Sequence, residues 1–307
     1  MKVYLNQLKE SWVVDRFRSD WYKNNLDVST ELINESEVIW IIAPWVWSKI
    51  PKKQLKQKKV ICSIYHIDFD NFTERDKKDF YKRDAYVDEY HVISKKTLIQ
   101  LELLTDKKIW CIPFWVDQNI WFYINEKEKL RKEFGFEDQD FLIGSFQRDT
   151  EGKDLKTPKM IKGPDIFLNL VKIIYQDNKN LRVILTGKRR NYLIERLQSL
   201  EIPFSYFEMV DLIQLNKLYN VLDLYLVTSR VEGGPQAIVE CAISKTPILS
   251  TNVGISTEIL HPKSIFEETN FLEAKTDIEF AYNKVKNLTI PKGMEEYRRM
   301  LHKVYEN

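Results

Sequence analysis

The 307-residue sequence lacks paired cysteines, a long apolar run and an excess of charge of one sign. Its three cysteines, Cys62, Cys111 and Cys241, lie far apart and outside any C-x-x-C pair, which favours a reducing cytosol and disfavours structural zinc. The most membrane-like run, residues 38–47, is far shorter than the roughly 20 apolar residues that span a bilayer. With 47 basic and 45 acidic residues, the net charge is only +2, so the chain has no overall positive potential that would bind a nucleic acid.

The first residues also lack the unbroken apolar core of a signal peptide, because Lys9 and Glu10 interrupt it. We therefore expect a cytoplasmic protein. A hydrophobic fraction of 44% and a charged fraction of 30% are ordinary for a globular chain. The length favours two domains of about 150 residues each.

Two series of strand-like runs alternating with amphipathic stretches predict two α/β domains with parallel, doubly wound sheets. In the first series, the expected strands are residues 2–5, 38–42, 60–64 and 89–93, and residues 73–84 form a solvated helix. In the second, strands at 141–145, 181–186, 222–227 and 247–250 alternate with helices at 163–175, 192–200, 212–219 and 235–243. We expect an N-terminal domain at residues 1–115, a C-terminal domain at 116–290 and a last helix at 291–307.

One segment between an expected strand and an expected helix carries most of the chemical information. It contains Ser229, Glu232, Gly233, Gly234, Pro235 and Gln236, and Glu240 follows two helical turns later. Two glycines permit close backbone approach, and the free N–H groups of a helix N-terminus attract an anion. At 1.5 Å per residue, the two glutamates are about 12 Å apart, roughly the distance from a sugar past a diphosphate to a ribose.

This segment resembles the E-x7-E signature of the retaining GT-B glycosyltransferases of family 4. The likeness extends from Ser229 through the run at 247–250 to Gly254 and Glu258. It implies two Rossmann-like domains facing across a cleft, with the last helix crossing back to the N-terminal domain. The implied activity is transfer of a sugar from a nucleotide diphosphate to a glycan, lipid-linked or small-molecule acceptor, with retention of configuration, in surface polysaccharide or glycoconjugate synthesis.

The resemblance also implies roles for individual residues. Glu232 orients the sugar hydroxyls, Glu240 binds the ribose, and the nucleotide base lies near Gly187, Met209 and Val210. Arg148 and Lys162 stabilise the leaving diphosphate, assisted by backbone N–H groups around Gly234. His66 resembles the family's strand-ending histidine, although a structural role is equally expected for a lone histidine after a strand. No D-x-D motif has a donor-site context, so we expect no metal and no cofactor besides the donor substrate.

The sequence departs from the family pattern in two places. A lysine-rich loop at residues 151–161 is inserted between Arg148 and Lys162, so Lys153, Lys156 or Lys159 could substitute for Lys162. The first loop, residues 6–13, contains no glycine, and the N-terminal domain is short for the family. These departures keep open an alternative, a non-catalytic protein of the same fold that binds a nucleotide sugar or serves as a scaffold.

All eight tryptophans occur at or before Trp121, which favours an aromatic core in the N-terminal domain over aromatic walls for an acceptor. The loop with Trp45 and Trp47 precedes a lysine run at residues 52–59. Together they could give weak peripheral contact with an anionic membrane at its inner face. A solvated helix face is the favoured interpretation of that run.

Overall fold

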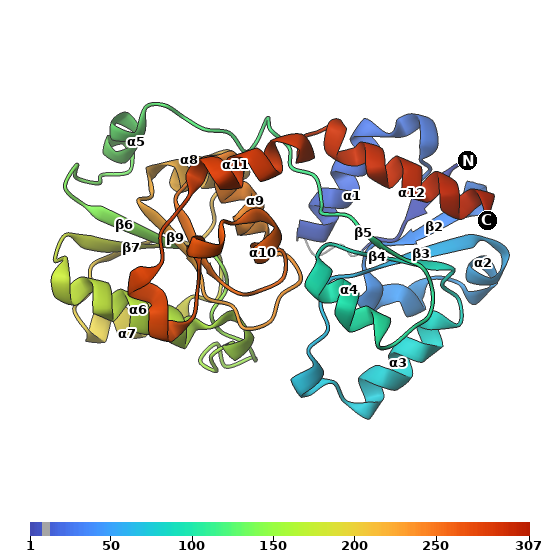
Figure 1. Ribbon diagram of the computed structural model, residues 1–307, viewed down its shortest axis with the longest axis horizontal. Helices are drawn as coiled ribbons and strands as arrows, with labels where there is room; N and C mark the ends of the chain where they lie inside the picture. Colours follow the sequence, from blue (N-terminus) through green and yellow to red (C-terminus); the bar gives the residue numbers. More distant parts are fainter. Residues whose placement is uncertain (8–12) are drawn as a thin grey trace. The chain divides into compact units, whose positions relative to one another are not determined.

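The computed structural model describes residues 1–7 and 13–307, which form two compact units. Unit 1 comprises Met1–Trp115 and Leu288–Asn307, and unit 2 comprises Val116–Asn287. Each unit holds one parallel β-sheet with helices on both of its faces (Figure 1). Within the described part of the chain, every helix is too short or too polar to cross a bilayer. The glycine-free loop at residues 6–13 lies largely outside the described residues.

The sheet of unit 1 contains five parallel strands in the order β1-β2-β3-β4-β5, which is also their order in the chain. The strands are β1 (Val3–Leu5), β2 (Val38–Ile41), β3 (Lys59–Ile64), β4 (Glu89–Val92) and β5 (Ile109–Cys111). The helices are α1 (Val13–Asn24), α2 (Lys52–Gln57), α3 (Glu74–Asp84), α4 (Lys95–Glu102) and α12 (Glu295–Glu306). This sheet therefore lacks the reversal of strand order that a doubly wound sheet has.

The period-2 alternation of β2 separates the core of unit 1 into two layers. Val38 and Trp40 pack with α1 and α12, whereas Ile39 and Ile41 pack with α2, α3 and α4. The predicted return of the last helix to the N-terminal domain is confirmed, because α12 contributes buried side chains to the first layer.

The sheet of unit 2 has six parallel strands in the order β11-β10-β9-β6-β7-β8, so the chain reverses direction across the sheet between β9 and β6. The strands are β6 (Phe141–Ser145), β7 (Leu181–Thr186), β8 (Phe204–Phe207), β9 (Leu224–Val227), β10 (Ile248–Thr251) and β11 (Ile265–Phe266). The helices are α5 (Lys127–Glu133), α6 (Pro164–Asp177), α7 (Asn191–Ser199), α8 (Leu212–Val221), α9 (Gln236–Ile243), α10 (Ser256–Ile259) and α11 (Ile278–Val285). In open α/β sheets, ligands bind beyond the carboxyl ends of the strands at such a reversal.

The expected aromatic core of the N-terminal domain is present, and it requires one correction. Trp21, Trp40 and Trp115 are at most 1% exposed and pack on one another. Trp47, which the less favoured membrane interpretation places beside Trp45 at the membrane surface, is only 6% exposed, and its indole N–H donates to the carboxylate of Asp79. Of the two side chains, only Trp45 is exposed, which removes half of the apolar contact that the membrane interpretation used.

A buried hydrogen-bond network connects α12 to the sheet of unit 1. His91, on β4, is fully buried, and its Nε2 lies 2.8 Å from the carbonyl oxygen of Ile112. Because a carbonyl only accepts, Nε2 carries the proton, and Nδ1 accepts from the Ser63 hydroxyl at 2.8 Å. Tyr297 of α12 donates to the same carbonyl at 2.9 Å. Burial lowers the pKa of His91 to about 4, so the ring stays neutral in the folded protein.

This low pKa predicts a pH-dependent stability of unit 1. The ordinary pKa of histidine is 6.5. Between pH 6.5 and about pH 4, His91 is therefore protonated in the unfolded chain and neutral in the folded chain. Stability is therefore retained above pH 6.5 and falls as the pH drops toward 4, by about 3 kcal/mol in total. Urea unfolding followed by tryptophan fluorescence reports this unit, because seven of the eight tryptophans belong to it.

The substitution His91→Gln should flatten this pH dependence, while His302→Gln, on the solvent side of α12, should preserve it. His302 is a suitable control because its side chain is 61% exposed. Equal slopes for wild type and His91→Gln between pH 7 and pH 5 would show that His91 does not resist protonation.

Candidate functional site

The loop that carries Glu232, the first glutamate of the E-x7-E pair, follows β9, next to the carboxyl end of β6, where the strand order of unit 2 reverses. Helix α9 begins at Gln236, so Pro235 lies just before the first turn rather than inside it as expected. The first N–H groups of a helix have no acceptor within the helix and give this end a partial positive charge. The local fold therefore presents an anion-attracting end beside the carboxyl ends of two central strands.

Two glycines outside this loop allow the backbone to pack against it. Gly163 has φ +60°, and a Cβ there would lie 1.9 Å from the carbonyl oxygen of Thr228. Gly254 has φ +50°, and a Cβ there would lie 2.2 Å from the carbonyl oxygen of Gly233. A left-handed conformation and a clash with backbone both exclude a side chain at these positions.

Glu232 and Lys162, two of the predicted site residues, form an ion pair. The Lys162 Nζ lies 2.8 Å from Glu232 Oε1, and the two side chains are 22% and 14% exposed. The Ser229 hydroxyl donates to the same oxygen of Glu232. The structure thus brings Lys162 to Ser229 and Glu232, from which it is distant in sequence. Lys162 lies in a 3-10 turn (Met160–Lys162) before the start of α6.

Gln147 belongs to this cluster and is absent from the sequence predictions. Its amide nitrogen donates to the carbonyl oxygen of Lys162 at 3.0 Å, and its amide oxygen lies 3.2 Å from the Ser229 hydroxyl. Its place two residues after β6 is a signal that could have identified it, since side chains at the carboxyl ends of parallel strands gather at one edge. Arg148 follows it, half-buried in the same loop.

Arg230, within the signature, braces the loop. Its guanidinium forms a bidentate pair with Asp165 at 2.8 and 2.7 Å and donates to the carbonyl oxygen of Met160. The hydrogen bonds from Arg230 hold the pKa of Asp165 below its usual value. This pair connects α6 and the turn before it to the signature loop.

Glu240 is buried in α9, with an exposed fraction of 5%. It accepts a hydrogen bond from the Tyr219 hydroxyl at 2.9 Å. Burial, reinforced by the Glu240 carboxylate, raises the pKa of Tyr219 well above its usual value. No local pattern in the sequence indicated this partner, because Tyr219 lies on a different helix, α8.

The residues expected near a nucleotide base follow two paired strands, β7 and β8. Gly187 comes directly after β7 with φ +84°, and its carbonyl oxygen accepts from Tyr206 at 3.0 Å. Met209 and Val210 follow β8, and the Met209 side chain is 69% exposed. Of these two strands, β7 neighbours β6 in the sheet, and β8 is the edge strand beyond β7.

The remaining predicted residue, His66, lies in unit 1. It is exposed in the loop after β3, at the carboxyl edge of the first sheet. Residues of unit 2 supply all the other predicted site positions.

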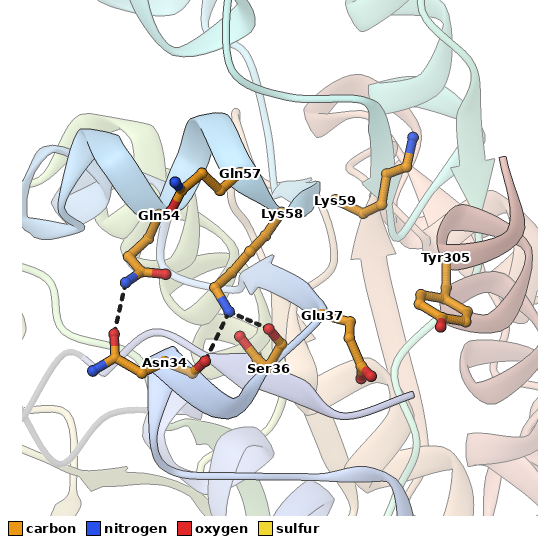
Figure 2. A pocket seen from close by; sticks show the side chains of 8 residues that line it. All are labelled: Asn34, Ser36, Glu37, Gln54, Gln57, Lys58, Lys59 and Tyr305. Atoms are coloured by element: carbon orange, nitrogen blue, oxygen red, sulfur yellow. Dashed lines mark hydrogen bonds between the residues drawn. The ribbon is translucent and has the colours of Figure 1, made fainter.

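Unit 1 also has a polar pocket of about 420 Å³ at the amino ends of β2 and β3, the edge opposite to His66. Figure 2 shows that its inner polar groups bond to one another: Gln54 donates to Asn34, and Lys58 donates to the carbonyl oxygens of Asn34 and Ser36. The Lys58 ammonium therefore already has acceptors within the protein, and the pocket lies at the opposite edge of this sheet from His66.

The model of the family described as glycosyl transferases group 1 matches residues 126–303, more than half of the chain. The protein belongs to this family. Its match begins just before α5 and covers every predicted site residue except His66.

This group 1 chain is 26% identical over 241 residues to a probable sucrose-phosphate synthase of Thermosipho melanesiensis, a match that covers 73% of this chain. The chain spans about half the length of that relative, 49%. The structure resembles that of Anabaena HepE in complex with UDP, with a TM-score of 0.76, 13% identity and 98% and 99% of the two chains covered. It also resembles sucrose-phosphate synthase of Thermosynechococcus elongatus, with a TM-score of 0.68, 13% identity and 95% and 76% covered. These likenesses show the GT-B fold.

The packing at Gly254 predicts that substitution by alanine destabilises the protein more at Gly254 than at Gly135. Gly135 also has a positive φ, +72°, but a Cβ there meets nothing within 4 Å. Gly135→Ala should therefore lower the free energy of unfolding by about 1 to 2 kcal/mol, through backbone strain alone. Gly254→Ala should lower it by a further 1 to 3 kcal/mol or so, because the new methyl group must displace the Gly233 carbonyl. Urea unfolding followed by circular dichroism compares the two variants, and a smaller loss at Gly254 than at Gly135 would contradict the close packing.

Proposed function

We propose that this protein is a retaining glycosyltransferase that moves a sugar from a nucleotide diphosphate to an acceptor hydroxyl without a metal ion. The observation that carries the proposal is the cluster of Lys162, Glu232 and Ser229 beside the N-terminus of α9, at the strand-order reversal of a group 1 family member. The acceptor is a glycan, a lipid-linked glycan or a small molecule.

In the proposed reaction, the bond between the anomeric carbon and the β-phosphate oxygen breaks while the acceptor oxygen bonds to the same face of the sugar. The electron pair of the broken bond stays on the diphosphate, which gains negative charge. Arg148, Lys162 and the free N–H groups of α9 stabilise that charge. The acceptor proton passes to an oxygen of the leaving phosphate, so no separate base is required.

The two glutamates differ in surroundings, and this difference supports different roles. Glu232 is partly exposed and pairs with a cation that the diphosphate would also attract. Glu240 is buried about one turn inside α9, with Tyr219 as a partner. We assign Glu232 to the transferred sugar and Glu240 to the ribose, with the base near Gly187, Met209 and Val210.

The donor is proposed to be a UDP-sugar, because HepE, a TarM mutant and GtfA, whose structures this chain resembles, are complexes with UDP, and HepE is also seen with UDP-glucose. The test is to incubate the protein with UDP-, GDP- and ADP-sugars and a panel of glycan acceptors, in the presence of excess EDTA. We expect release of nucleoside diphosphate together with a glycosylated product of unchanged anomeric configuration.

Three results would contradict parts of the proposal. A rate that returns only on addition of magnesium or manganese would reject metal independence, and a product of inverted configuration would reject retention. Binding of the donor without turnover across the panel would favour the alternative, a non-catalytic nucleotide-sugar-binding protein.

The division of roles predicts that one substitution lowers the transfer rate and another weakens nucleotide binding. Glu232→Gln should reduce the rate of transfer by about 10² to 10³-fold, because the negative charge of Glu232 beside the transferred sugar is lost. The affinity for the nucleoside diphosphate should stay nearly unchanged. Glu240→Ala should weaken nucleoside diphosphate binding by roughly tenfold to a hundredfold, the loss expected for a hydrogen bond to a charged group. Calorimetric titration and transfer rates of both variants decide between these roles.

Tyr219→Phe is the matched control for Glu240, since it removes the partner hydroxyl and keeps the carboxylate. It should affect nucleotide binding far less than Glu240→Ala does. If Glu232→Gln loses nucleotide affinity and Glu240→Ala keeps it, the donor lies in the reverse orientation.

A further inference from the structure

Most of the inserted loop at residues 151–161 forms a hairpin whose two ends are hydrogen-bonded to each other. Thr150 and Pro158 form an antiparallel bridge, and the Glu151 N–H donates to the Thr157 carbonyl at 2.9 Å. At the tip, the Asp154 carboxylate accepts from the Thr157 hydroxyl at 2.9 Å and from two backbone N–H groups. The residues before and after the hairpin therefore lie close together, despite the insertion between them.

The base of this hairpin is fixed by a buried ion pair. Asp149 and Arg190, with side chains 2% and 0% exposed, lie 3.3 Å apart. The Asp149 carboxylate also accepts from the N–H groups of Tyr192 and Leu193 at the start of α7. The Asp149 N–H donates to the Arg189 carbonyl at 3.0 Å. This anchoring holds the residue that follows Arg148 against the body of unit 2.

The backbone of Lys159 is hydrogen-bonded to Asp149, which follows Arg148, and to Lys162. Its N–H donates to the carbonyl oxygen of Asp149 at 2.8 Å, and its carbonyl oxygen accepts from the Lys162 N–H at 2.8 Å. Its backbone is thus fixed between the segment that carries Arg148 and the turn that carries Lys162.

The Lys159 ammonium is half-buried and has neither a hydrogen bond nor an ion pair among residues 1–7 and 13–307. Burial, followed by the charges of Arg148 and Lys162, lowers its pKa to about 8, and the carboxylates of Glu151 and Glu232 offset this only in part. Glu232 is already bonded to Lys162 and Ser229. A partly desolvated cation that no carboxylate contacts directly is unfavourable, and a bound dianion would stabilise it.

We propose that Lys159, returned to the site by the inserted hairpin, is a third diphosphate-binding cation that acts beside Arg148 and Lys162. This inference rests on the proposed function. It also distinguishes among the inserted lysines: Lys153 and Lys156 are exposed near the hairpin tip, and Lys162 keeps its own ion pair with Glu232. Lys159 therefore adds to Lys162 and does not replace it.

The test uses the full chain and calorimetric titration with UDP, with GDP and ADP in parallel so that the identity of the base does not decide the outcome. Lys159→Met keeps the aliphatic length and removes the charge. It should raise the Kd of the diphosphate roughly tenfold or more, the effect expected for loss of one charge-assisted hydrogen bond. The affinity for the corresponding nucleoside, which has no phosphate, should not change.

Lys156→Met is the matched control, since it removes an equal charge from the same hairpin, and it should bind like wild type. Lys159→Arg should restore most of the affinity, which separates loss of charge from a disturbed hairpin. Equal diphosphate affinity of Lys159→Met, Lys156→Met and wild type would overturn the role of Lys159 and leave the proposed function intact. Failure of wild type to bind any of the nucleoside diphosphates would instead overturn the proposed function.

Discussion

Close backbone contact at the end of β9 is the constraint on which the candidate site depends. The Thr228 and Gly233 carbonyls occupy the space that side chains at positions 163 and 254 would need. The Thr228 hydroxyl, which donates to the Gly163 carbonyl at 2.9 Å, adds a bond to the first of these contacts. Only this proximity lets Lys162 reach Glu232 across 70 positions of sequence. The charges of the site follow from the packing of its backbone.

Much of this architecture could be predicted from the sequence because its signals are local. The strands of unit 2 are continuous apolar runs, and the predicted strand at 141–145 coincides with β6. Thr73 and Asp76 form the capping box that begins α3, so the charged segment at 73–84 folded as expected. The E-x7-E loop was recognisable for the same reason, since strand end, glycines and helix start lie within a short segment. Strands β8 and β11 were missed; β8 is a partly exposed edge strand and β11 has two residues, so neither gives a strong pattern.

The parts that could not be predicted depend on contacts between distant segments. The burial of Trp47 follows from Asp79 on α3, and the setting of Glu240 follows from Tyr219 on α8. Nothing in the composition of the inserted loop distinguishes Lys159 from its neighbours. Its position is set by the hydrogen bonds that close the hairpin onto Asp149. The chain-order arrangement of the first sheet is likewise a property of strand pairing, which short apolar runs do not encode.

The core of unit 1 is assembled from two segments that lie far apart in the sequence, Met1–Trp115 and Leu288–Asn307. During synthesis, residues 1–115 emerge long before Tyr297, Met300 and Leu301, which fill part of their core. Until those residues have been made, the Trp40 and Phe114 rings that stack on Tyr297 have no cover on that side. Unit 2 is contiguous in the chain, and contiguous domains generally fold as units while translation continues. Unit 1 therefore cannot complete its core until residues 288–307, which follow unit 2 in the sequence, have been made.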